Sequence, residues 1–107
     1  MNAYLILVLA ITFEVIGTMM LPLSQNFTKA VPTIILMLSY IVSFYFLAIV
    51  SQKLPLPIVY SSWAGLGVFS IAVLSYIYYK QPLNWQTITG LFLIVIGVVL
   101  VNVYKAN

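Results

Sequence analysis

The sequence predicts an all-α membrane protein with four transmembrane helices. Of its 107 residues, 64% are hydrophobic and only 5% are charged, whereas soluble domains are about 45–50% apolar and about 25% charged. A helix that crosses the hydrocarbon core needs about 20 mostly apolar residues. The chain therefore has room for four spans and little else, and we expect residues 1–107 to form a single four-helix transmembrane domain.

The first two apolar stretches are separated by a polar turn. A helix is predicted over residues 3–21, ending before Pro22 and the polar segment 24–26, which has the composition of a loop. The second helix is predicted over residues 31–51. Its Pro32 falls in the first turn, where a proline is tolerated.

The last two stretches are bounded by prolines and polar residues. The segment 52–57 contains a lysine and two prolines and is predicted to be a short turn. The third helix then covers residues 58–79 and ends at the Lys-Gln-Pro sequence of residues 80–82. Asn84 is a candidate N-cap for a fourth helix over residues 85–104.

The composition excludes several classes of function. The chain has no cysteine or histidine and one acidic residue, so it lacks the ligands for a metal site and the residues of a nucleophilic triad. Its four lysines are spread singly rather than clustered, which argues against a nucleic-acid partner. We expect no enzymatic activity, no metal and no cofactor, with membrane lipid as the surroundings.

The lysines are distributed evenly across the predicted membrane. Four consecutive spans place Lys29 and Lys80 on one side, and Lys53 and Lys105 on the other. Because lysine bias in short loops sets orientation, this chain could insert both ways up, and opposite copies could pair as an antiparallel homodimer. The alternative is that lipids or the insertion machinery select one orientation.

Glu14, the only acidic residue, lies near the middle of the first predicted helix. A charge at that depth costs about 2.5–3.5 kcal/mol on insertion scales, and such residues usually mark an ion or substrate pathway. Ala10, Gly17 and Thr18 share its helical face, so small side chains surround the carboxylate and leave space beside it.

Two roles for Glu14 follow from this position. It could be a protonated acid that hydrogen-bonds a neighbouring helix, or a site that alternates between a proton and a cation. The second role requires surroundings that disfavour the charged form, because an ordinary glutamate is almost wholly ionised at pH 7. Desolvation in a membrane has this effect, and a bound organic cation would reverse it and expel the proton.

Aromatic residues at mid-span are candidates for a cation pocket. Tyr40 lies in the middle of the second helix with Ser43 and Phe44 on its face, and Tyr60 and Trp63 are three residues apart in the third. Aromatic faces attract cations by about 0.5–2 kcal/mol each, so these rings would suit a flat, lipophilic cation beside the acid. Core packing and an interfacial tryptophan are the alternative explanation.

The glycines suggest flexibility in one helix and close contact in another. Gly65 and Gly67 would permit a bend in the third helix. Gly90 and Gly97 lie seven residues apart on one face of the fourth helix with Ile94 between them, as in helices that approach closely in membranes. They predict a dimer contact, although packing within one chain would use glycines in the same way.

The segments "AITFEVIGT", "PIVYSSWAGLG" and "GLFLIVIGVVLVN", together with the four-span length, resemble the small multidrug resistance transporters over essentially the whole chain. The resemblance implies an antiparallel homodimer in the bacterial inner membrane that exchanges protons for drug cations by alternating access. It makes Glu14 the shared proton and substrate site. The residues implied to line or flank the cation pocket are Ala10, Gly17, Thr18, Tyr40, Tyr60 and Trp63.

The resemblance also implies a bend at Gly65 and Gly67 and a dimer contact at Gly90 and Gly97. The guanidinium-exporting branch typically has a tryptophan and a lysine where this chain has Gly17 and Asn102, so the chain looks like the quaternary-ammonium, multidrug branch. Two alternatives remain open. One is export of a metabolite such as a polyamine or guanidinium, and the other is a non-transporting membrane assembly subunit.

Overall fold

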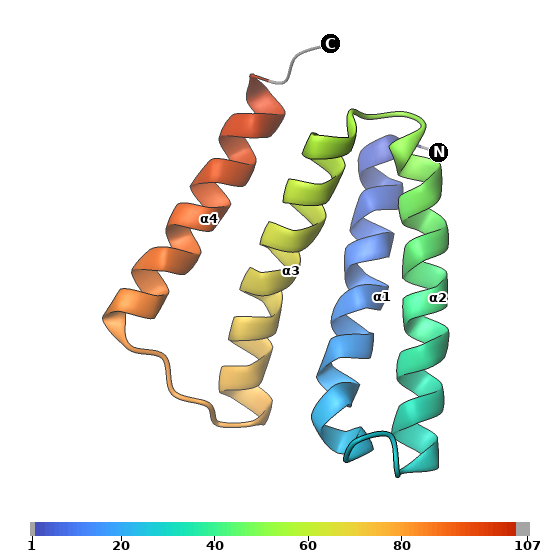
Figure 1. Cartoon of the computed structure of the whole chain (residues 1–107). Helices are drawn as coiled ribbons and strands as arrows, with labels where there is room; N and C mark the ends of the chain where they lie inside the picture. Colours follow the sequence, from blue (N-terminus) through green and yellow to red (C-terminus); the bar gives the residue numbers. More distant parts are fainter. Residues whose placement is uncertain (1, 105–107) are drawn as a thin grey trace.

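The computed structural model of the chain describes residues 2–104, which form four helices (Figure 1). They are α1 (Ala3–Ser24), α2 (Ala30–Ser51), α3 (Leu56–Tyr78) and α4 (Trp85–Val103). Each is long and apolar enough to cross a membrane. The predicted all-α, four-span architecture is confirmed.

Helix α1 continues through Pro22 to Ser24, three residues beyond the end predicted near Leu21. A proline removes one N–H from the helical bonding pattern, but this one lies in the last turn, where few bonds remain to be lost. Gln25 is the C-cap of the helix. It adopts φ 47° and ψ 64° and donates its N–H to the carbonyl oxygen of Pro22.

The other boundaries agree with those predicted or differ by one or two residues. Helix α3 begins at Leu56, because Pro57 lies in the first turn, where its missing N–H has no helical partner to lose. Asn84 is the N-cap of α4, and its side-chain oxygen accepts a bond of 2.7 Å from the backbone N–H of Thr87. Helix α2 starts at Ala30 and α4 ends at Val103, each one residue earlier than predicted.

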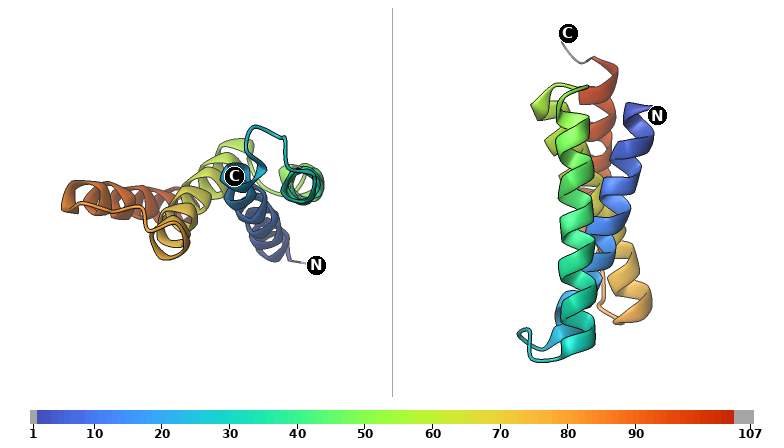
Figure 2. Two further views of the ribbon diagram at one scale, coloured as in Figure 1. Left: turned by 90° about the horizontal axis from the view of Figure 1, so that it is seen from below. Right: turned by 90° about the vertical axis from the view of Figure 1, so that its right-hand side faces the viewer.

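Helix α1 lies between α2 and α3 and carries most of the core (Figures 1 and 2). It packs most extensively on α2, whereas α4 packs mainly on α3. The two figures show the beginning of α4 diverging from the other helices. Within α4 only Val98 is buried. The buried apolar cluster comes from α1, α2 and α3 and comprises Ile6, Leu7, Ile11, Val15, Val50 and Val59.

A chain of side-chain hydrogen bonds ties the last turns of α4 to α1 and α3. The hydroxyl of Tyr4 donates to the side-chain oxygen of Asn102 at 2.9 Å, and the amide of Asn102 donates to the hydroxyl of Ser62 at 2.8 Å. Ser62 is buried. Since unsatisfied polar groups are costly in a membrane, these bonds hold the C-terminal end of α4 in place while its N-terminal end diverges.

Gly65 lies on the face of α3 that packs against α4. A Cβ atom at this position would lie 2.6 Å from Cγ2 of Val98 and 3.1 Å from Cγ2 of Ile94, so the glycine permits packing within the chain. Helix α3 is continuous from Leu56 to Tyr78, and the bend at Gly65 and Gly67 stays a prediction.

Gly90 and Gly97 have a different environment. A Cβ atom at either position would meet nothing within 4 Å among residues 2–104. A side chain at either glycine would therefore begin in open space within one copy, and their dimer contact stays a prediction.

Candidate functional site

The carboxylate of Glu14 is held on one side only. Its Oε1 atom accepts a hydrogen bond of 3.3 Å from the hydroxyl of Thr18, one turn further along α1. The same hydroxyl lies 2.8 Å from that of Tyr40 on α2. The other carboxylate oxygen, Oε2, is buried and has no hydrogen-bond partner within residues 2–104, although buried polar atoms are normally satisfied.

Two glycines let neighbouring groups come close to this acid. A Cβ atom on Gly17 would lie 2.9 Å from Cε1 of Tyr40, so the glycine makes room for the tyrosine ring. A Cβ atom on Gly67 of α3 would lie 3.3 Å from Oε2 of Glu14. Sequence reasoning assigned Gly67 to a bend and missed this proximity, because nothing in the spacing places α3 against Glu14.

An aromatic cavity of about 250 Å³ opens beside the acid, with Glu14, Tyr40, Phe44 and Trp63 in its lining. The rings of Phe44 and Trp63 have centroids 5.9 Å apart at an interplanar angle of 50°. Three helices thus contribute one aromatic cavity with a carboxylate in its wall. Such a cavity has the groups needed to hold an apolar cation by charge and by ring faces.

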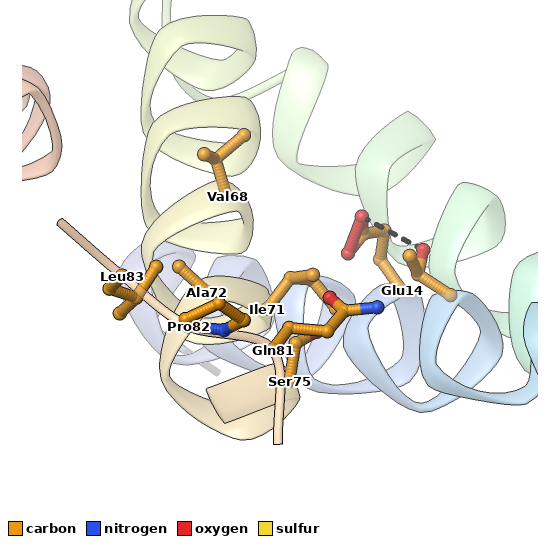
Figure 3. Close-up of a pocket in the computed structure, with 9 residues that line it drawn as sticks. Glu14, Val68, Ile71, Ala72, Ser75, Gln81, Pro82 and Leu83 are labelled. Atoms are coloured by element: carbon orange, nitrogen blue, oxygen red, sulfur yellow. Dashed lines mark hydrogen bonds between the residues drawn. The ribbon is translucent and has the colours of Figure 1, made fainter. Parts of the chain in front are cut away.

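A second cavity, of about 390 Å³, also has Glu14 in its lining (Figure 3). It extends from Glu14 and Thr18 along α3 to the connection between α3 and α4. Sequence reasoning missed this cavity, although one signal was present. Four lining residues have the spacing of a single helical face: Val68, Ile71, Ala72 and Ser75. The remaining lining residues are Gln81, Pro82 and Leu83.

Four residues predicted for the pocket do not line the two cavities at Glu14, and one of them, Gly17, lies against the ring of Tyr40. Ala10 and Ser43 are buried in the contact between α1 and α2, where the Ser43 hydroxyl donates to the Ala10 carbonyl oxygen at 2.7 Å. Tyr60 is 65% exposed and lies beside Trp63, with ring centroids 6.0 Å apart. Ala10 and Ser43 are absent from both linings because they join α1 to α2. Tyr60 is absent although its ring lies beside that of Trp63.

Comparison with known proteins gives consistent results. Residues 2–94 match the family described as Small Multidrug Resistance protein. The chain is 44% identical over 104 residues to the quaternary ammonium compound-resistance protein QacH of Staphylococcus saprophyticus, covering 97% of each chain. It is 39% identical over 102 residues to QacE of Escherichia coli, covering 95% of this chain and 93% of QacE.

A third relative carries a broader description. The multidrug resistance protein EbrA of Bacillus atrophaeus is 35% identical over 99 residues, covering 92% of this chain and 94% of EbrA. The chain therefore belongs to the Small Multidrug Resistance protein family and is, as predicted, a multi-pass protein of the bacterial inner membrane and not an enzyme.

Proposed function

We propose that this protein exports quaternary ammonium and other lipophilic aromatic cations in exchange for protons, with Glu14 binding each in turn. The observation that carries the proposal concerns Oε2 of Glu14, the only acid in the sequence. This oxygen has no hydrogen-bond partner in the described part of the chain and is buried next to a cavity lined by Tyr40, Phe44 and Trp63. The substrate class is supported by the names of the relatives, which describe resistance to quaternary ammonium compounds.

The exchange follows from competition for one carboxylate. A proton neutralises Glu14 and removes the attraction for a cation, whereas a bound cation stabilises the ionised form and favours loss of the proton. Because both states use the same group, the protein binds a proton or a cation but not both. Protons are the coupling ion, and no cofactor is needed.

We further propose that the working unit is an antiparallel homodimer that operates by alternating access. The uncovered face of α4 around Gly90 and Gly97 offers a surface for a second copy. Evenly distributed lysines permit both orientations. In such a dimer, each side of the membrane would face an equivalent half of the transporter.

Proton release on cation binding tests this function. Detergent-solubilised protein would be mixed with tetraphenylphosphonium in weakly buffered solution between pH 5 and 9, and released protons counted against bound cation. Release should approach one proton per cation where Glu14 starts protonated and should fall toward zero at high pH, where it is already ionised. Binding without release at any pH would refute a shared carboxylate. Absence of binding would favour a metabolite exporter or an assembly subunit.

Replacing Trp63 with leucine is expected to weaken tetraphenylphosphonium binding about tenfold. The reason is that an aromatic face contributes up to about 2 kcal/mol to a desolvated cation, and each 1.4 kcal/mol is a factor of ten in the dissociation constant. The matched control is Trp85→Leu, because Trp85 is 71% exposed at the start of α4. Isothermal titration calorimetry would compare the two, and equal affinities would remove Trp63 from the cation site.

A further inference from the structure

The two oxygens of the Glu14 carboxylate have different surroundings. Oε1 accepts the Thr18 hydroxyl at 3.3 Å, whereas Oε2 has no hydrogen-bond partner among residues 2–104 and lies next to the backbone of Gly67. A carboxylate with one oxygen bound and one free cannot treat them alike, because a new proton or cation is bound most easily where no hydrogen bond has to be broken.

The direction of the bonds follows from counting protons. The Thr18 hydroxyl has a single hydrogen. When Glu14 is ionised, its carboxylate has no hydrogen and can only accept hydrogen bonds. Thr18 therefore donates its hydrogen to Oε1. The 2.8 Å contact between Thr18 and Tyr40 must then be donated by the tyrosine. The chain of bonds therefore runs from Tyr40 on α2, through Thr18, to Oε1 of Glu14 on α1.

We propose that Thr18, oriented by Tyr40, is a positioning residue that binds Oε1 of Glu14 and leaves Oε2 as the oxygen for which proton and cation compete. The Tyr40 hydroxyl then acts on Glu14 through Thr18, while the tyrosine ring lines the aromatic cavity. This inference rests on the proposed function, since it assigns the shared proton and cation site to one atom.

The other groups near the carboxylate do not supply an equivalent contact. From α2, the titratable group that faces Glu14 is Tyr40, through Thr18. From α3, the Gly67 backbone lies close to Oε2 and does not titrate. Trp63 of α3 lines the aromatic cavity with Glu14, but its ring N–H makes no hydrogen bond to the carboxylate within residues 2–104. The lining of the second cavity adds Ser75 and the uncharged amide of Gln81. Among residues 2–104, Thr18 is therefore the hydrogen-bond donor to this acid.

Loss of the Thr18 hydroxyl should shift the pH midpoint of cation-induced proton release in a defined direction. A hydrogen bond to an ionised acceptor is stronger than one to a neutral acceptor, so Thr18 favours the ionised form of Glu14. Replacing it with valine, which keeps the shape, should shift the midpoint of cation-induced proton release upward by about one pH unit, as expected for one charge-assisted hydrogen bond. Thr18→Ser restores a hydroxyl and should return the midpoint toward that of the wild type.

The experiment measures the pH midpoint of proton release by tetraphenylphosphonium for the wild type, Thr18→Val and Thr18→Ser. The matched control is Thr12→Val on the same helix, because the Thr12 hydroxyl donates to the backbone oxygen of Val8 at 2.8 Å. This control should keep the wild-type midpoint. An unchanged midpoint in Thr18→Val would overturn the proposal, whereas an absence of release in the wild type would instead refute the antiporter.

A double-mutant cycle tests the route through Thr18. Tyr40→Phe keeps the ring but removes the hydroxyl, and it should shift the midpoint in the same direction by a smaller amount. The shift should vanish in the Thr18→Val background, because no hydroxyl is left to orient. Additive shifts would show that Tyr40 acts on Glu14 or on the cation directly and would overturn the relay. Retained tetraphenylphosphonium binding at pH 9 confirms that each variant is folded.

Discussion

Glu14→Gln is expected to abolish proton-coupled cation export while leaving the chain folded. Glutamine has the shape of glutamate, and its carbonyl oxygen can still accept the Thr18 hydroxyl that now bonds Oε1. It can neither release a proton nor hold a negative charge. The proton and the cation therefore both lose the carboxylate that binds them. Transport driven by a pH gradient should fall to the level of protein-free vesicles.

Uptake of labelled tetraphenylphosphonium into proteoliposomes with an imposed pH gradient measures this loss directly. Glu14→Asp serves as the graded comparison, because it keeps the charge and moves it by one methylene group. It should retain measurable exchange with an altered pH dependence. If Glu14→Gln transports as well as the wild type, the acid is a structural hydrogen-bonding group and the assembly-subunit interpretation gains support.

The second large effect is expected for Gly97→Leu, which should prevent dimer formation and with it transport. Nothing within the described chain lies within 4 Å of a Cβ atom at Gly97, so leucine meets no obstacle in one copy. Close approach of two membrane helices, however, depends on small residues in the contact. We expect the dimer dissociation constant to rise more than tenfold, which corresponds to about 1.4 kcal/mol, and the helical content to stay unchanged.

Förster transfer between labelled copies in liposomes would measure the dimer, and circular dichroism would verify the helices. Val99→Phe is the matched control, because Val99 is also exposed on α4 but lies two residues further along, on nearly the opposite face. It should leave the dimer intact. A Gly97→Leu protein that remains fully dimeric would show that this glycine stripe is not the contact between copies.

Composition and periodicity were sufficient to predict the architecture. A chain of 107 residues that is 64% hydrophobic can satisfy its backbone in a membrane only by forming helices along each apolar stretch. The prolines mark the ends less reliably. Pro22 lies inside α1 and Pro57 inside the first turn of α3. A proline in the first turn has no helical N–H bond to lose, and Pro22 removes a single bond close to the end of its helix.

The sequence by itself also pointed to Glu14, because a lone acid in an apolar helix is costly wherever the helix packs. Only the tertiary structure decided what surrounds it. It brings Gly67 against Oε2 and turns the Tyr40 hydroxyl to Thr18, while Tyr60 lies outside the aromatic cavity. The physical reason is that helical spacing tells which residues share a face, whereas the rotation of each helix against its neighbours is set by packing between residues far apart in the sequence.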